Sequence, residues 1–179
     1  MEKVFRMVHL ISNESYLHSF QYKVVHRVLN CNKNLHKWKI KDSPVCIYCP
    51  ETDSIEHHLF YCNRVQLLWK NIFSWLHKIF EPDNIEEPRI CEIIFRVHID
   101  AKNISPKIYC MNLVILLGKW YINQMRSQSK TVHFLEFCSV VKLKIEIYLT
   151  NFKTTKTLER VDGGIKKSLK MLLNTLPMI

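Results

Sequence analysis

The stretch CIYCPETDSIEHHLFYC, residues 46–62, places three cysteines and two histidines within seventeen residues. Its spacing is C-x2-C-x7-H-x4-C when Cys46, Cys49, His57 and Cys62 are taken as the ligands of one metal ion. Zinc binds four such ligands at tetrahedral corners, and a C-x2-C turn presents two thiolates from one tight bend. His58 competes with His57 as the third ligand, because either histidine lies about one helical turn before Cys62. The spacing therefore predicts a zinc site and leaves the choice of histidine open.

Four protein ligands indicate a structural zinc ion, because a catalytic zinc ion keeps one position open for water. Three thiolates and one neutral imidazole give such a complex a net charge near −1, and the acidic residues Glu51, Asp53 and Glu56 lie in the same stretch. We therefore expect one structural Zn2+ that fixes the helices on either side of it. Loss of the metal is expected to unfold residues 40–65 and to leave later helices partly formed. The alternative is that the four side chains only pack together.

The remaining cysteines lie singly in apolar or helical surroundings, and we interpret them as packed free thiols. They are Cys31, Cys91, Cys110 and Cys138.

Basic residues are concentrated in the two flanks of the chain, whose formal net charge is +10. Residues 1–45 carry eight Lys/Arg against three Asp/Glu, and residues 101–179 carry thirteen against four, whereas residues 46–62 carry none against three. Basic flanks are typical of a protein that meets a polyanion, and a solvated basic surface is the alternative. The sequence shows no secretory signal and no apolar run long enough to span a bilayer. We therefore expect an intracellular protein, nuclear or cytoplasmic, that is neither secreted nor bound to a membrane.

Apolar residues recur at helical spacing along most of the chain, and only three glycines interrupt it. The predicted fold class is mostly α: a helical domain with a small CCHC zinc-knuckle module inserted near residue 50. Ser105 and Pro106 are typical of a helix start, and the apolar run 109–122 that follows is expected to be a buried helix. Helices are predicted over residues 16–29, 65–80, 105–125, 134–148 and 158–176. We divide the chain into residues 1–80, an N-terminal helix plus the zinc module; residues 81–103, a linker or exposed loop; and residues 104–179, a C-terminal helical region.

Three motifs around the cysteines resemble the zinc-binding region that follows the polymerase in non-LTR (LINE-type) retrotransposon reverse transcriptases. They are a Y-x-x-x-H-R-x-L helix at residues 22–29, an I-K-D-S-P-x-C approach at residues 40–46, and a closure of the E-x-H-x-L-F-x-C type before a tryptophan, matched by Glu56 to Cys62 (EHHLFYC) and Trp69. The resemblance covers about residues 18–80. In that family the histidine ligand typically precedes the last cysteine by five positions, which selects His57. The later LLGKWYINQMR, residues 116–126, also resembles the helix that closes such reading frames.

The resemblance implies the C-terminal segment of a target-primed reverse transcriptase, where such a module assists binding to element RNA or target DNA. The sequence contains no polymerase-type Asp-Asp motif and no evident endonuclease cluster of carboxylates. Catalysis is therefore not carried over, and we expect a protein that is not an enzyme. We interpret the chain as a fragment, a truncated element copy or a free-standing domain.

The leading hypothesis is a zinc-stabilised module that binds RNA or DNA, with a preference for single-stranded or structured nucleic acid. Trp38 is available to stack on a base, although packing beneath lysine side chains is the alternative for this residue. The residues predicted to contact nucleic acid are Lys23, Arg27, Lys33, Lys37, Trp38, Lys39 and Lys41.

The second hypothesis is a zinc-stapled protein-interaction module that docks on a polymerase or another partner, and a non-functional element fragment is a further alternative. A zinc hydrolase is disfavoured, because the ligand set is saturated and no H-E-x-x-H motif is present.

Overall fold

A computed structural model describes residues 8–80, 94, 105–151 and 162–177, and within them the protein is mostly α-helical. These residues contain no strand, only an isolated antiparallel bridge between Val45 and Thr52. The predicted fold class is therefore confirmed. The helical elements are α2 (Ser15–Val25), α3 (Asn32–Lys37), the π-helical turn η1 (His57–Tyr61), α4 (Asn63–Phe80), α6 (Pro106–Ser127), α7 (Phe134–Asn151) and α8 (Asp162–Asn174).

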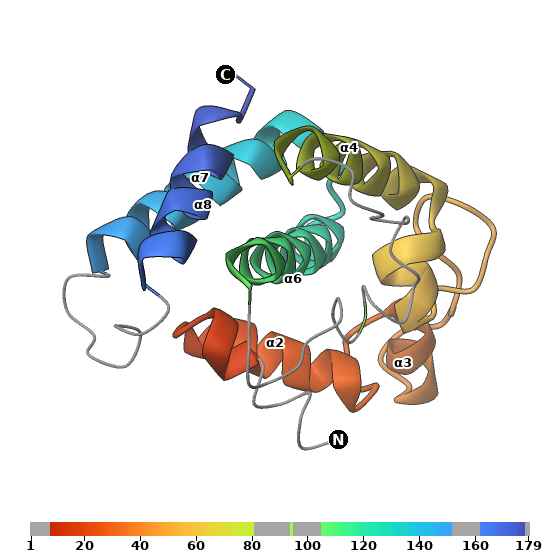
Figure 1. Ribbon diagram of the computed structural model, residues 1–179. Coiled ribbons are helices and arrows are strands. Elements are labelled where there is room, and N and C mark those ends of the chain that lie inside the picture. The colour runs from red at the N-terminus through yellow and green to blue at the C-terminus, as the bar shows by residue number, and fades with distance from the viewer. Residues whose placement is uncertain (1–7, 81–93, 95–104, 152–161, 178–179) are drawn as a thin grey trace.

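Helix α6 lies in the centre of the molecule, with α2, α4, α7 and α8 arranged around it (Figure 1). Every residue from Tyr109 to Lys119 is buried, so this helix is enclosed on all sides rather than amphipathic. Its start is the predicted one, because the Ser105 hydroxyl caps the helix by accepting from the backbone N–H of Ile108 at 3.2 Å. The buried helix expected from the apolar run 109–122 is thus confirmed.

Helix α4 packs against α6 through the apolar stripe predicted for residues 65–80. The Trp69 ring is 2% exposed and donates its indole N–H to the carbonyl of Leu59 at 2.7 Å. Gly118 of α6 faces this ring: a Cβ at residue 118 would lie 2.9 Å from Trp69 Cη2. The absence of a side chain at Gly118 therefore allows α4 and α6 to approach closely.

Three helices end in the same way, with a residue of positive φ one position after the cap. These residues are Arg27 (φ 59°) after α2, Lys39 (φ 60°) after α3 and Ser129 (φ 55°) after α6. In each case the following N–H bonds to a carbonyl five residues earlier, as from Ile40 to Leu35 at 2.8 Å. This is the Schellman pattern, in which the left-handed position usually holds glycine.

The helix ends explain where sequence periodicity was inaccurate. The first predicted helix, residues 16–29, ends at Val25 because the chain turns at Arg27, and Val28 is consequently exposed. The short helix α3 falls in a segment that the sequence indicated to be an irregular basic connection. The last predicted helix is described from Asp162 onward, so its first turn contains the glycine pair 163–164.

The predicted loop, residues 81–103, lies outside the described residues except for Ile94, and so do Cys91 and residues 152–161. The hydrophobic core of the described residues includes side chains from before residue 80 and from after residue 104. The division of the chain into domains at these positions stays a prediction. No helix among the described residues has the length and apolar character needed to cross a membrane.

Candidate metal centre

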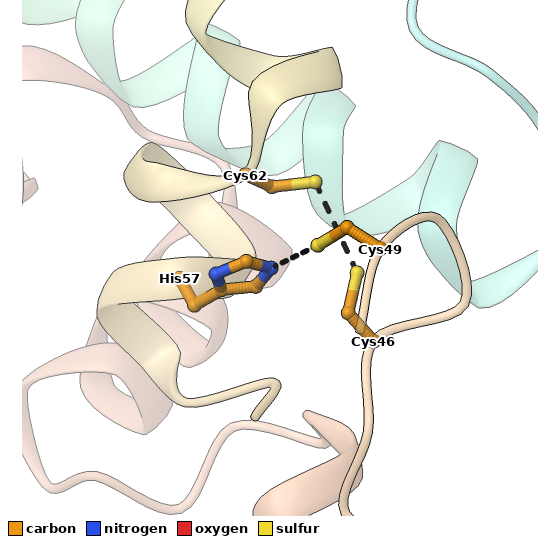
Figure 2. A group of neighbouring side chains, drawn as sticks. All are labelled: Cys46, Cys49, His57 and Cys62. Carbon is orange, nitrogen blue, oxygen red and sulfur yellow. Dashed lines mark hydrogen bonds between the residues drawn. The ribbon is translucent and has the colours of Figure 1, made fainter. Parts of the chain in front are cut away.

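The four predicted ligands converge in the structure, although two come from a loop and two from a helical turn (Figure 2). Their ligand atoms all lie within 4.8 Å of one another. Cys46 Sγ is 3.9 Å from Cys62 Sγ, and Cys49 Sγ is 3.2 Å from His57 Nε2. Tetrahedral zinc with its usual bond lengths would hold two sulfurs about 3.8 Å apart and a sulfur and a nitrogen about 3.5 Å apart. The residues therefore fit a zinc ion.

The first two ligands are carried by a short hairpin, whose arms meet at the Val45–Thr52 bridge. The Cys46 N–H donates to the carbonyl of Glu51 at 2.8 Å, and the Asp53 N–H donates to that of Pro44 at 2.9 Å. At the tip, the Tyr48 N–H points at Cys46 Sγ from 3.4 Å. Burial alone would raise the pKa of Cys46, but the N–H donors of Tyr48 and Arg126 outweigh it and lower that pKa to about 6. These N–H donors thus favour the thiolate form, which is the form that binds zinc.

The second pair of ligands brackets the π-helical turn. The Cys62 N–H bonds to the carbonyl of His57 at 3.0 Å, five residues earlier, which is the spacing of a π-turn. In a regular α-helix, residues five apart would point about 140° away from each other. The wider turn brings His57 and Cys62 to the same side. Ser54 fixes the start of this turn by accepting from the His57 N–H at 3.1 Å.

His58 points away from the ligand cluster and has different neighbours. Its Nδ1 lies 3.1 Å from Arg126 Nε and 3.2 Å from Asp53 Oδ2. Burial lowers the pKa of His58, which favours the neutral ring. Because Arg126 Nε can only donate, Nδ1 of the neutral ring accepts from it. His58 therefore belongs to a polar network behind the zinc ligands.

Asp53 and Arg126 form the centre of that network, and sequence reasoning assigned neither of them to the site. Arg126 Nη2 donates to Asp53 Oδ1 at 2.6 Å and to Cys46 Sγ at 3.2 Å. The other oxygen, Asp53 Oδ2, accepts from the backbone N–H of Asn32 at 2.9 Å, at the start of α3. Burial alone would raise the pKa of Asp53, but the charge of Arg126 and the hydrogen bond from the Asn32 N–H lower it, so the carboxylate stays charged. A single arginine 64 residues after the last ligand gives no sequence signal for this role.

The residues predicted to contact nucleic acid lie on the surface around α2 and α3. Asn34 joins α3 to the segment that follows α2, since its Nδ2 donates to the carbonyls of Arg27 and Leu29 at 2.9 and 2.8 Å. Arg27 forms an ion pair with Glu56, so its charge is partly offset. Lys41 Nζ donates to Asn32 Oδ1 at 2.9 Å. The other predicted residues are also exposed: Lys23 on α2, Lys33 and Lys37 on α3, and Trp38 and Lys39 in the turn that follows.

Trp38 is 41% exposed, and both interpretations of its ring, stacking on a base and packing beneath lysine side chains, stay predictions.

Comparison with known proteins finds a family model that matches part of the chain. Residues 6–69, slightly more than a third of the chain, match the model of a family described as zinc-binding in reverse transcriptase. This match confirms the resemblance predicted from the motifs around the cysteines, and it supports a zinc-binding, reverse-transcriptase-associated region at these positions. Together with the Cys3His cluster, it supports one structural zinc site. Searches of curated proteins and of solved structures found no match.

Proposed function

We propose that this chain is a zinc-stabilised module that binds single-stranded or structured RNA or DNA. The observation that carries the proposal is the exposed basic surface beside the zinc hairpin, formed by Lys33, Lys37 and Lys39 together with the half-exposed Trp38. Lysines supply the phosphate contacts that dominate nucleic-acid affinity, and an exposed indole supplies a face on which a base can stack. In this proposal the zinc ion has a structural role and the module has no catalytic one.

The backbone conformation at Lys39 supports a role for its side chain. An L-residue in the left-handed conformation costs about 1–2 kcal/mol, and glycine is the usual residue at such a position. Both Arg27 and Lys39 occupy such positions and both are basic. Strained positions of this kind are often retained where the side chain serves a function.

Two neighbouring cavities beside the basic surface offer space for a nucleic-acid strand. One, of about 290 Å³, is lined by Lys41, Asn32 and Arg126 among others, and the other, of about 470 Å³, lies between α2 and α6. Asn30 and Asn123 line both of them. Amide side chains can bond to the edges of bases, and none of the residues lining the larger cavity is acidic.

The larger cavity also presents aromatic rings and a lysine. Tyr16 and Trp120 lie with their ring centroids 5.2 Å apart, and Lys23 lies on the same wall as Tyr16 along α2. Rings that stack bases and cations that contact phosphates are the common components of single-strand binding sites. We therefore assign the path of the nucleic acid to the surface from Lys23 past these cavities to Lys39.

The test is binding of the zinc-loaded chain to labelled single-stranded RNA and DNA at increasing salt. The logarithm of affinity should fall linearly with the logarithm of salt concentration, by about 0.7 per neutralised phosphate. Replacing Lys33, Lys37 and Lys39 with glutamine should flatten that slope by up to about two units. The matched control replaces the exposed Lys70, Lys78 and Lys142, which removes the same charge from other surfaces. No binding at low salt would contradict the proposal, and equal slopes for the two triple variants would contradict the assigned surface.

A second candidate function, docking on a protein partner, is favoured by exposed apolar side chains between the end of α3 and the zinc hairpin. Ile40 is 68% exposed, and Val45 and Ile47 are 40% and 44% exposed. A polymerase or another protein could cover them. Docking on a protein partner becomes the favoured function if the zinc-loaded chain does not bind nucleic acid at low salt.

A further inference from the structure

One side chain of α6, that of Arg126, contacts the zinc hairpin. Arg126 lies in the last turn of α6, far in sequence from residues 46–62. Its guanidinium contacts three different parts of the zinc module at once: Cys46 Sγ at 3.2 Å, Asp53 Oδ1 at 2.6 Å and His58 Nδ1 at 3.1 Å.

The burial of this group makes the contacts consequential. The side chains of Arg126 and Asp53 are each 2% exposed, so both charges are largely removed from bulk water. A buried charge is tolerated only when it is paired and hydrogen-bonded. Three thiolates and an imidazole around Zn2+ carry a net charge near −1, and the Asp53 carboxylate adds a second negative charge beside it. Arg126 lies between these two anionic groups and is the cation that separates them.

A second contact fastens the same end of α6 to the hairpin tip. The Arg126 guanidinium lies over the Tyr48 ring, 5.1 Å from its centroid. The Tyr48 hydroxyl donates to the carbonyl of Lys130, immediately after the left-handed residue Ser129 that follows α6. The end of α6 thus contacts the C-x2-C turn in two places, at the sulfur of Cys46 and at the ring and hydroxyl of Tyr48.

We propose that Arg126 is a positioning residue of the zinc centre, and that the C-terminal end of α6 is part of the zinc-binding unit. Arg126 donates an N–H to a ligand sulfur and fixes Asp53 and His58 behind the ligands. Groups of this kind orient metal ligands and tune their affinity. The family match ends at residue 69, so this part of the zinc unit lies outside it.

The proposal changes what metal removal should do. From sequence, the loss of zinc is expected to unfold residues 40–65 and to leave later helices partly formed. If Arg126 couples the thiolates to α6, chelation should also release the end of α6, residues 121–130. The two expectations differ at backbone amides that hydrogen exchange can follow.

The test compares zinc affinity in the full chain for Arg126→Met, Arg126→Lys and the control Arg64→Met. Arg64 is exposed and only two positions from Cys62, so its replacement removes the same charge from a place nearer in sequence to a ligand. By competition with a chromogenic chelator, Arg126→Met should bind zinc about 10–100-fold more weakly, whereas Arg64→Met should match the parent chain. Arg126→Lys should fall between them, because an ammonium group cannot reach all three groups as a planar guanidinium does.

Two further measurements separate a role at the metal from a general loss of stability. In the cobalt-substituted chain, removing the N–H donor to Cys46 should shift the sulfur-to-cobalt absorption bands, and Arg64→Met should leave them in place. In the parent chain, chelation should increase hydrogen exchange at residues 121–130 together with residues 46–62.

The proposal is wrong if Arg126→Met folds and binds zinc within twofold of the control with unshifted cobalt bands. It is equally wrong if chelation leaves exchange at residues 121–130 unchanged. Should Arg126→Met fail to fold even with zinc, Arg126→Lys decides: parental affinity and parental bands in that variant would overturn the assignment.

Discussion

His57 and His58 are adjacent in sequence, but only His57 faces the three cysteines. Replacing His57 with alanine removes a ligand, so zinc binding should weaken by more than the roughly 10–100-fold expected for changes behind the ligands. Replacing His58 with alanine leaves the four ligand atoms in place and disrupts buried hydrogen bonds, at a cost of about 1–3 kcal/mol in the free energy of unfolding. Chelator-driven zinc release and urea unfolding of the zinc-loaded variants measure the two effects. A stronger effect of His58 than of His57 on zinc release would show that the ligand set is wrong.

The ligands could be predicted from sequence because they are local, whereas the groups that support them are not. Cys46, Cys49 and Cys62 follow from spacing alone, and the family resemblance selects His57 over its neighbour. The physical reason for that selection is the π-turn, whose carbonyl at His57 accepts from Cys62. The hydrophobic periodicity of the sequence does not predict a π-turn at these residues. Arg126 could not be predicted either, since its partners are brought to it only by the packing of α6.

Lys39 combines a strained backbone with an exposed basic side chain, so one substitution should have two opposite effects. Lys39→Gly relieves the left-handed conformation and should raise the free energy of unfolding by up to about 1 kcal/mol. The same change removes a phosphate contact and should weaken nucleic-acid binding.

Lys39→Gln is the control, because it removes the charge and keeps the Cβ atom. It should lose affinity to a similar degree without gaining stability. Urea unfolding and nucleic-acid titration of both variants make the comparison, and equal stabilities would argue against strain at this position.

At the scale of helices, sequence periodicity located α4, α6 and α7 well. Their apolar residues recur at a spacing that matches burial in the fold, and Ser105 and Pro106 mark the start of α6. Periodicity missed α3, whose sequence NKNLHK has a single apolar residue. That helix is held by tertiary contacts: Asp53 accepts from the N–H of Asn32 through its carboxylate and from that of Lys33 through its carbonyl. Such contacts are visible only after the hairpin has been placed.

The α4–α6 contact should be sensitive to a single methyl group. A Cβ at residue 118 would lie 2.9 and 3.1 Å from two atoms of the Trp69 ring, which is held by its indole hydrogen bond to Leu59. Overpacking of this kind costs about 1–3 kcal/mol, and the gain in helix propensity from glycine to alanine is about 1 kcal/mol. Because the ring is buried and held by this hydrogen bond, Gly118→Ala should lower the free energy of unfolding, by up to about 2 kcal/mol.

Gly163→Ala is the matched control in α8, where a Cβ would meet nothing within 4 Å. This variant should be neutral or slightly more stable, since only helix propensity changes. Urea unfolding of both zinc-loaded variants provides the measurement. Stabilisation by Gly118→Ala would show that the ring yields more easily than its contacts indicate.

At the scale of the whole molecule, α6 joins parts of the chain that are distant in sequence. Its middle carries Gly118 against α4 and Lys119 toward α2, and its end carries Arg126 into the zinc hairpin. Residues that line the two cavities, among them Asn123, lie on the same last turns. Zinc binding, the packing of α6 and the proposed nucleic-acid surface are therefore expected to respond to one another.

Lys119 is a buried basic residue of this central helix, with 3% of its surface exposed. Its Nζ donates to Gln21 Oε1 of α2 at 2.6 Å and to the carbonyl of Ile94 at 3.1 Å. Burial lowers its pKa from 10.5 to about 7. Between these two values the unfolded chain binds a proton that the folded chain does not, so the free energy of unfolding rises with pH in this range.

We therefore expect the contribution of Lys119 to appear as a pH-dependent difference between the parent chain and Lys119→Met, which keeps the aliphatic side chain and removes the charge. Urea unfolding of both zinc-loaded proteins between pH 6.5 and 9 gives the measurement. Relative to the variant, the parent should gain stability as the pH rises above about 7, with a slope approaching 1.4 kcal/mol per pH unit. Other titrating groups affect both proteins equally and cancel in the difference. Parallel curves across this range would mean that Lys119 keeps its proton in the folded state, with Gln21 and Ile94 stabilising the ammonium against burial.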